Sequence, residues 1–184
     1  MSDGTPFGTL KITDLLGLDN DLVVNGDRVF VVTLTNGRYN LLEVNEPRTA
    51  LNEVDTGTSL APTGMISNDD DLYYLRGDVV YHVSGSDTPD IVNSINATAL
   101  FYTGSTTDYF YAVSGNRVWL LNDGSATSIT RSTGFSDASG LSLAGEYVFF
   151  TAASNGIPVV WASHLTGTGA NGGATELTDG TYNM

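Results

Sequence analysis

The chain has 184 residues and a mass of 19.4 kDa, which suits one domain with a core of its own and excludes a large multidomain enzyme. Hydrophobic residues make up 41% of the chain and aromatic residues 10%, enough apolar surface for a folded protein. Seven Lys and Arg against 21 Asp and Glu give a formal net charge of −14, so nucleic acid and anionic membrane surfaces are unfavourable partners.

Strands are predicted almost everywhere along the chain. The apolar runs are short, rich in β-branched or aromatic residues, and bounded by Gly, Asn, Asp and Ser, which is typical of strands. No window of 11 or more residues keeps a helical period without interruption, so we expect essentially no long helix. In chain order the runs cover residues 22–24, 29–34, 39–44, 72–75, 79–83, 99–102, 109–113, 117–121, 147–152 and 158–163.

Tight turns separate pairs of these runs. Residues that tolerate a positive φ stand at Asn36-Gly37, Gly77-Asp78, Gly115-Asn116 and Asn155-Gly156. We therefore expect each pair of runs to form an antiparallel hairpin.

The hairpins recur with a regular period. Four segments share an acidic residue, an apolar strand, a tight turn and a second apolar strand, and their acidic residues Asp27, Asp71, Asp108 and Glu146 are 44, 37 and 38 residues apart. This spacing fits one four-stranded propeller blade per repeat, about 40 to 50 residues. The expected inner strands are 22–25, 64–67, 99–103 and 141–144, and the expected outer strands are 50–54, 90–94, 128–132 and 174–178.

The sequence therefore predicts one all-β, β-propeller-like domain over residues 1–184, with four antiparallel four-stranded blades. A strand at 8–14 precedes the first blade and is expected to close the ring by completing the last blade, in competition with 174–178. The expected repeats are approximately 15–57, 58–96, 97–134 and 135–180.

A repeat motif supports this fold. The segment Asp3-Gly4-Thr5-Pro6-Phe7-Gly8-Thr9-Leu10 resembles the Thr-Asp-Gly-Thr-x-x-Gly-Thr signature of bacterial β-propeller repeat proteins, whose blades read Leu-Trp-x-Thr-Asp-Gly-Thr. Degenerate forms are Asp179-Gly180-Thr181, Trp119-Leu120-Leu121-Asn122-Asp123-Gly124-Ser125 and Val160-Trp161-Ala162-Ser163. The resemblance implies a β-propeller and no particular activity, because propellers host binding modules, enzymes and scaffolds alike.

Catalytic groups are sparse. The two histidines, His82 and His164, lie in or beside predicted strands, and there is neither a cysteine nor a Gly-x-Ser-x-Gly elbow. Asp137, Glu146 and Asp179 are candidates for the paired acids of a glycoside hydrolase or lyase, but any chain with this many acidic residues offers similar pairs, and turn and surface roles are the preferred interpretation. We expect a protein that is not an enzyme, with the hydrolase or lyase as the lower-ranked alternative.

Two acidic stretches are candidate calcium sites. Asp19 and Asp21 form one, and Asp69, Asp70 and Asp71 form the other; clustered oxygen ligands in a loop are what calcium requires. Neither stretch has the complete loop with its distal Glu. The default expectation is a solvated turn and no cofactor, with a structural Ca²⁺ as the alternative.

Four aromatic residues are candidate contacts for a ligand or partner. Trp119 and Trp161 occupy similar places in successive repeats, and Tyr39 and Tyr81 lie on the corresponding arm of the other two. Core packing between blades is one interpretation. The other places some of these rings on an exposed face, where they stack on a sugar or anchor a protein.

The function predicted from the sequence is a structural or protein-interaction module. A cysteine-free, lysine-poor β-chain rich in Ser, Thr, Gly and Asn is typical of a virion component such as a phage tail, baseplate or capsid-decorating protein, with protein partners that include other copies of itself. The alternative is a carbohydrate- or surface-ligand-binding propeller that is part of a longer exported protein.

Location follows from the same alternatives. Residues 1–6 have neither a basic nor an apolar signal region, and no stretch approaches the roughly 18 apolar residues of a spanning helix. We expect no membrane insertion. A native start at Met1 favours the virion or the cytoplasm, and a fragment of an exported protein favours the outside of the cell.

Overall fold

The computed structural model describes residues 18–25, 28–44, 51–68, 71–85, 88–103, 109–130, 135–165 and 174–177. These residues form sixteen strands and no helix, and therefore no helix long and apolar enough to cross a membrane. The all-β class is confirmed. The predicted strand at 8–14 and its part in closing a ring lie outside the described residues.

Four separate four-stranded sheets follow one another along the chain. In every sheet the strands pair in sequence order and run antiparallel, so each sheet is a meander. Sheet A contains β1 (Leu18–Asn25), β2 (Arg28–Thr35), β3 (Arg38–Val44) and β4 (Leu51–Thr58). Sheet B contains β5 (Pro62–Ser67), β6 (Asp71–Arg76), β7 (Val79–Ser84) and β8 (Asp90–Asn96).

Sheets C and D repeat this arrangement. Sheet C contains β9 (Ala99–Tyr102), β10 (Phe110–Ser114), β11 (Arg117–Asn122) and β12 (Ser125–Ser128). Sheet D contains β13 (Phe135–Ala144), β14 (Tyr147–Ser154), β15 (Ile157–His164) and the two-residue β16 (Thr175–Glu176). The central hairpins turn at Asn36-Gly37, Gly77-Asp78, Gly115-Asn116 and Asn155-Gly156, as predicted from the turn residues.

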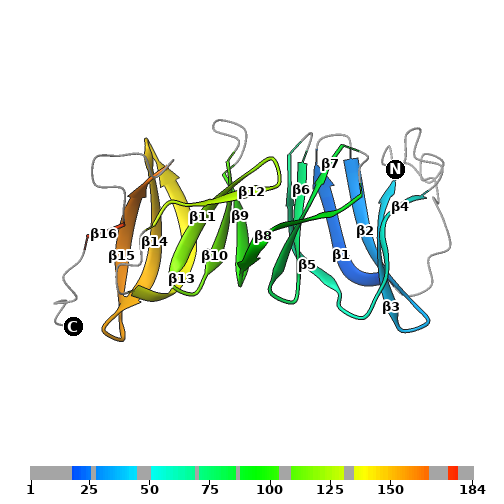
Figure 1. The fold of residues 1–184 in the computed structure, drawn as a ribbon, viewed down its shortest axis with the longest axis horizontal. Coiled ribbons are helices and arrows are strands. Elements are labelled where there is room, and N and C mark those ends of the chain that lie inside the picture. The colour runs from blue at the N-terminus through cyan, green and yellow to red at the C-terminus, as the bar shows by residue number, and fades with distance from the viewer. Residues whose placement is uncertain are drawn as a thin grey trace, which may run out of the picture.

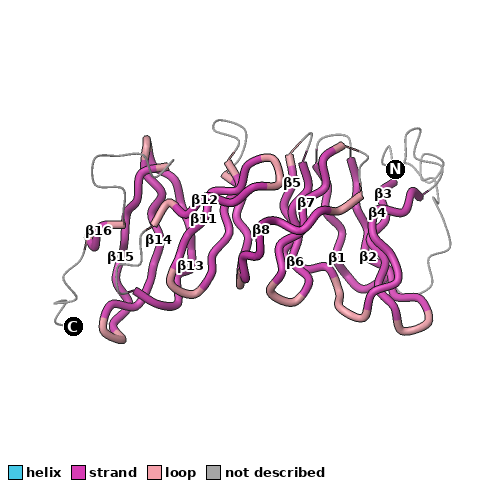
Figure 2. Tube along the Cα trace, viewed as in Figure 1, coloured by secondary structure: helices cyan, strands magenta, loops and turns pink. Residues whose placement is uncertain are grey.

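The sheets form an open row. Figure 1 shows sheets A, B, C and D side by side in chain order, with A and D at opposite ends, and Figure 2 shows the same row built from strands and short connections. Four antiparallel four-stranded sheets are thus observed, and the described strands do not close a ring.

Apolar side chains fill the space between consecutive sheets. Because both faces of the middle strands β6 and β10 are covered, their burial is nearly continuous rather than alternating. The A–B cluster contains Phe30, Val32, Leu41, Leu72, Tyr74 and Val83. The B–C cluster contains Tyr73, Leu75, Leu100, Phe110 and Ala112, and the C–D cluster contains Tyr111, Val113, Val148, Phe150, Ala152 and Trp161.

Polar contacts also join each sheet to the next. They satisfy groups that would otherwise be buried without a partner, and they fix how the sheets meet. Examples, one for each pair of sheets, are Tyr74 Oη to Asp55 Oδ2 at 2.5 Å between B and A, Gly124 N to Tyr73 Oη at 3.4 Å between C and B, and Ser163 Oγ to the Ile129 carbonyl at 2.9 Å between D and C.

Candidate functional site

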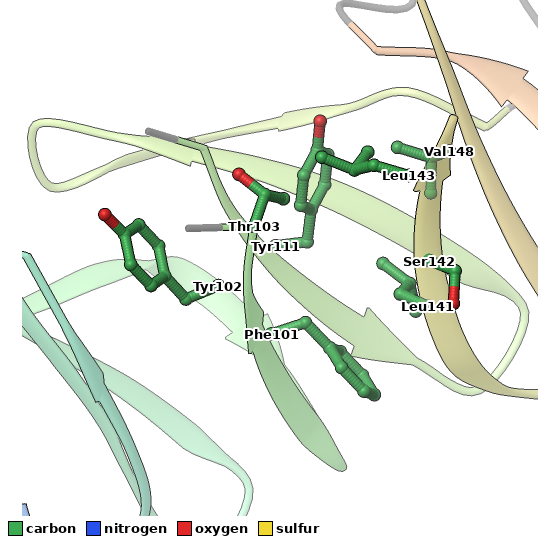
Figure 3. Close-up of a pocket in the computed structure, with 8 residues that line it drawn as sticks. All are labelled: Phe101, Tyr102, Thr103, Tyr111, Leu141, Ser142, Leu143 and Val148. Atoms are coloured by element: carbon green, nitrogen blue, oxygen red, sulfur yellow. The ribbon is translucent and has the colours of Figure 1, made fainter. Parts of the chain in front are cut away.

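A pocket of about 370 Å³ opens between sheets C and D. Phe101 and Tyr111 form one wall, since they are paired neighbours on β9 and β10 and share a face. Leu141, Leu143 and Val148 form the opposite wall, on β13 and β14 (Figure 3). Thr103, Ser142 and Tyr102 complete the lining.

A bend in β13 places the aliphatic wall. The pairing of β13 with β14 shifts between Ser136 and Ser139 and again between Ser139 and Ser142. Asp137 and Gly140 adopt positive φ values of 56° and 62° in this stretch, which Asp and Gly tolerate. Beyond the bend, Leu141 and Leu143 pack against the C–D cluster.

The described residues that line the pocket are uncharged, since none of them is Asp, Glu, Lys, Arg or His. Tyr111 donates a hydrogen bond from its hydroxyl to the Leu165 carbonyl at 3.3 Å, and burial raises the pKa of Tyr111. Thr103 Oγ1 lies 3.1 Å from the Tyr109 carbonyl. The hydroxyls of Tyr111 and Thr103 are thus engaged within the protein, and the described lining suits the apolar face of a neutral ligand better than acid–base chemistry.

His82 lies in a tight polar contact between sheets B and C. Its Nε2 is 2.7 Å from Asp71 Oδ1, and its ring stacks on Tyr73 with centroids 4.5 Å apart. The turn at Gly124 lies against the Nδ1 edge of the ring, because a Cβ built on that glycine would come within 3.1 Å of His82 Nδ1. His82 is only 6% exposed, so little of its imidazole is accessible to a substrate.

Burial also affects the tyrosine beneath His82. Tyr73 accepts a hydrogen bond from the Gly124 N–H. Burial raises the pKa of Tyr73 to about 12, with smaller contributions from Asp71 and Asp123 in the same direction. Tyr73 therefore stays neutral and packs as an apolar ring with one polar end.

His164 occupies a more open position in sheet D. Its Nε2 lies 3.9 Å from Glu146 Oε2, whose side chain is mostly exposed, and its ring meets Tyr147 edge-on at 5.9 Å. Such an exposed pair adds little stability. The two histidines thus lie in different sheets and contribute to no shared site.

The four predicted aromatic contact residues do not converge. Tyr39 and Tyr81 pack around the A–B cluster, Trp119 packs against the B–C cluster, and Trp161 is 5% exposed in the C–D cluster. The indole N–H groups of Trp119 and Trp161 are buried without a hydrogen bond among the described residues. Their positions are those of inter-sheet packing, and a ligand-binding role for them stays a prediction.

The predicted calcium residues are only partly described. Asp71 is engaged with His82, and its backbone N–H donates a hydrogen bond to Asn68 Oδ1 at 2.7 Å. Asp19 and Asp21 belong to β1, but their side chains, like Asp69 and Asp70 as a whole, lie outside the described residues. In the parts of the chain that the structure describes, no three His, Asp or Glu side chains gather as a metal site.

Exposed apolar side chains lie at both ends of the row. On β1, Leu22 and Val24 are 61% and 63% exposed and point to the same side of sheet A. On sheet D, Tyr147 is 49% exposed and Leu177 53%. Exposed apolar residues that share one side of a sheet are candidates for interaction surfaces. Neither pair was predictable from the sequence as an exposed surface, because the three consecutive apolar residues Leu22-Val23-Val24 indicate a strand but not which of its sides is exposed.

Comparison with known proteins bears on the fold alone. No protein-family model matches the chain, and comparison with curated proteins finds no significant match. A solved puromycin-hydrolyzing peptidase of Mycobacterium tuberculosis is similar over 83% of this chain and 27% of its own, with a TM-score of 0.52 and 12% identity. The tricorn protease matches 86% of this chain and 16% of its own, with a TM-score of 0.34 and 11% identity. The chain thus spans about a quarter of the first of these structures.

Proposed function

We propose that the four sheets are consecutive blades of a β-propeller-type repeat and that the chain is a non-enzymatic protein-interaction module. It works as an assembly component, such as part of a phage tail, baseplate or capsid decoration. The meander topology of every sheet, the face-to-face series and the fold similarity to a much longer chain support this architecture.

The exposed pair Leu22 and Val24 carries the proposal. In sheets B and C the equivalent first strands, β5 and β9, lie against the preceding sheet, with Met65 and Leu100 at the contacts. The first strand of sheet A has apolar residues facing the same way, yet these are mostly exposed. In sheets B, C and D this side of the sheet packs against the preceding sheet, whereas in sheet A it is available to a partner.

Measuring stability distinguishes two roles for Leu22 and Val24, a surface that docks a partner and a part of the hydrophobic core. Because exposed side chains contribute little to folding, Leu22→Ser with Val24→Ser should change the free energy of unfolding by less than about 1 kcal/mol. The same double variant should bind less of an uncharged apolar dye such as Nile red than the unaltered protein does. Leu60→Ser, at a residue that is 54% exposed in the connection between sheets A and B, is the matched control. A large loss of stability in the double variant would overturn the proposal.

The pocket between sheets C and D favours a second candidate function, a carbohydrate- or surface-ligand-binding propeller within a longer exported protein. The Phe101 ring and the absence of charge among the lining residues that the structure describes suit the apolar face of a neutral sugar. A panel of neutral glycans followed by calorimetry tests it. Phe101→Ala should abolish any binding found, and Leu22→Ser with Val24→Ser should leave it unchanged. Binding that survives Phe101→Ala would remove this candidate.

A further inference from the structure

Each sheet has two sides, and wherever two consecutive sheets meet, one side of the earlier sheet packs against the opposite side of the later one. We call the side of a sheet that faces the preceding sheet its leading side, and the side that faces the next sheet its trailing side. Tyr73 on β6 packs in the B–C cluster and its neighbour Tyr74 in the A–B cluster, so successive residues of one strand serve the two sides. Each of the three internal contacts thus pairs a trailing side with a leading side.

Two sides have no such partner among the described sheets: the leading side of A and the trailing side of D. On the leading side of A, Leu22 lies opposite Val31 and Val24 opposite Val29. Val31 is only 6% exposed, so the accessible part of this side is the β1 edge with Leu22 and Val24.

The trailing side of sheet D is also apolar. Val148 and Phe150 point back into the C–D cluster, so the alternate residues Tyr147 and Phe149 lie on the trailing side. Leu177 joins them, because its N–H donates to the Val160 carbonyl at 2.8 Å and continues the pairing of β15 with β16.

We propose, resting on the function proposed above, that the partner is a second copy of this chain, bound head to tail. The trailing side of D in one copy, with Tyr147 and Leu177, packs against the β1 edge of A in the other, with Leu22 and Val24. This contact pairs the same two kinds of side as the three contacts inside the chain. It joins two different surfaces, so repetition gives a ring if the rotation closes and a filament if it does not.

Charge sets a condition on this contact. Each copy carries a formal charge of −14, so two copies repel each other while their contact surfaces are apolar. Association should therefore strengthen as salt is added, because salt screens the repulsion.

Complementation between variants tests the head-to-tail contact. Light scattering coupled to size exclusion, on the full chain at several concentrations, should show self-association for the unaltered protein and for Leu60→Ser. Leu22→Ser with Val24→Ser removes one surface, and Tyr147→Ser with Leu177→Ser removes the other. Each double variant alone should associate about tenfold to a hundredfold more weakly.

An equimolar mixture of the two double variants keeps one intact surface on each. The mixture should therefore form a dimer and nothing larger, whereas a symmetric contact through one end would leave the variant of the other end able to associate alone. A monomer at every concentration and salt level, or association by either double variant alone as strong as that of the unaltered protein, would overturn the second-copy contact. If the stability and dye results at Leu22 and Val24 hold while the protein stays monomeric, only this inference fails and the proposed interaction surface stands.

Discussion

Gly124 illustrates how a single glycine holds two sheets together. Its φ of +69° favours glycine, and its Cα hydrogens face the ring of His82, where a Cβ would lie 3.1 Å from Nδ1. The same turn donates its N–H to Tyr73. One residue therefore sets the turn of sheet C and its contact with sheet B.

Replacing Gly124 with alanine should thus strain the backbone and displace the imidazole of His82. We expect Gly124→Ala to lower the free energy of unfolding by about 2 to 3 kcal/mol. Gly115→Ala is the matched control, since Gly115 also has a positive φ, +50°, but nothing lies within 4 Å of its Cβ position. It should cost only about 1 kcal/mol. If urea unfolding gave equal losses of stability for the two variants, the His82 side chain would be moving aside from the new methyl group at little energetic cost.

The buried tyrosines predict a response to high pH. Burial raises the pKa of Tyr73 from 10.0 to about 12, and burial and the Asp55 hydrogen bond raise that of Tyr74 further. Above pH 10 the unfolded chain loses a proton that folded Tyr73 keeps, so stability is full below pH 10 and falls as the pH rises towards 12. Tyr73 alone accounts for about 2 to 3 kcal/mol.

Absorbance at 295 nm should therefore show several of the nine tyrosines ionising only with unfolding, followed in parallel by circular dichroism. Tyr73→Phe should remove part of the loss of stability above pH 10. Complete tyrosine ionisation in a protein that is still folded at pH 11 would contradict this prediction.

At the scale of the strand, local sequence determines most of the fold. The central hairpins were predictable because a run such as Val29–Leu34 is β-branched, as long as one strand and followed at once by Asn36-Gly37. Strand β12 was predicted at 128–132 but spans Ser125–Ser128, because Asp123-Gly124 forms a two-residue turn directly after β11. The Asp-Gly pair was a sufficient signal for it.

Contacts between sheets were not predictable in the same way. The acidic repeat residues seemed equivalent in the sequence, yet Asp71 lies in β6 and pairs with His82, whereas Glu146 lies in the turn before β14. Whether a residue faces the preceding or the next sheet depends on how many residues separate it from the hairpin turn. Because the lengths of the repeats differ, the same position in two repeats can face opposite ways. The pocket at Phe101 was not predictable either, because it combines residues from two repeats and depends on the bend in β13.

The A–B contact contains a buried ion pair whose contribution can be measured. Arg76, 7% exposed, lies 2.8 Å from Asp55 Oδ2 without the alignment of a hydrogen bond, and Tyr74 donates to the same oxygen. Asp55→Ala leaves the guanidinium buried without its counter-charge, so we expect a loss of about 3 kcal/mol. Arg76→Met in that background should restore part of it.

Glu43→Ala is the control for this prediction. Glu43 pairs with Arg28 at 2.7 Å within sheet A, and both side chains are partly exposed, so its loss should cost about 1 kcal/mol or less. Thermal unfolding of the three variants and the unaltered protein provides the comparison. A cost for Asp55→Ala no greater than that for Glu43→Ala would show that Arg76 reaches water without its partner.

For the whole molecule, net charge is the dominant long-range effect. A charge of −14 on 184 residues favours expansion, and salt screens that repulsion. Sodium chloride should therefore raise the melting temperature of the monomer by about 2 to 4 °C, equivalent to about 1 kcal/mol for a chain of this size. Sucrose at the same osmolarity serves as the uncharged control. A melting temperature that does not change with salt would mean that the charges are too far apart for their repulsion to affect stability.

The meander topology also affects how the protein is made. Every strand pairs with the strand just before or after it, so each sheet is complete once a few tens of residues have been synthesised. The entropy lost in closing such short loops is small. Sheet A can therefore form while later residues are still in the ribosome, and each finished sheet provides an apolar wall on which the next can assemble. The order of the sheets in the row is thus also the order in which a growing chain can fold.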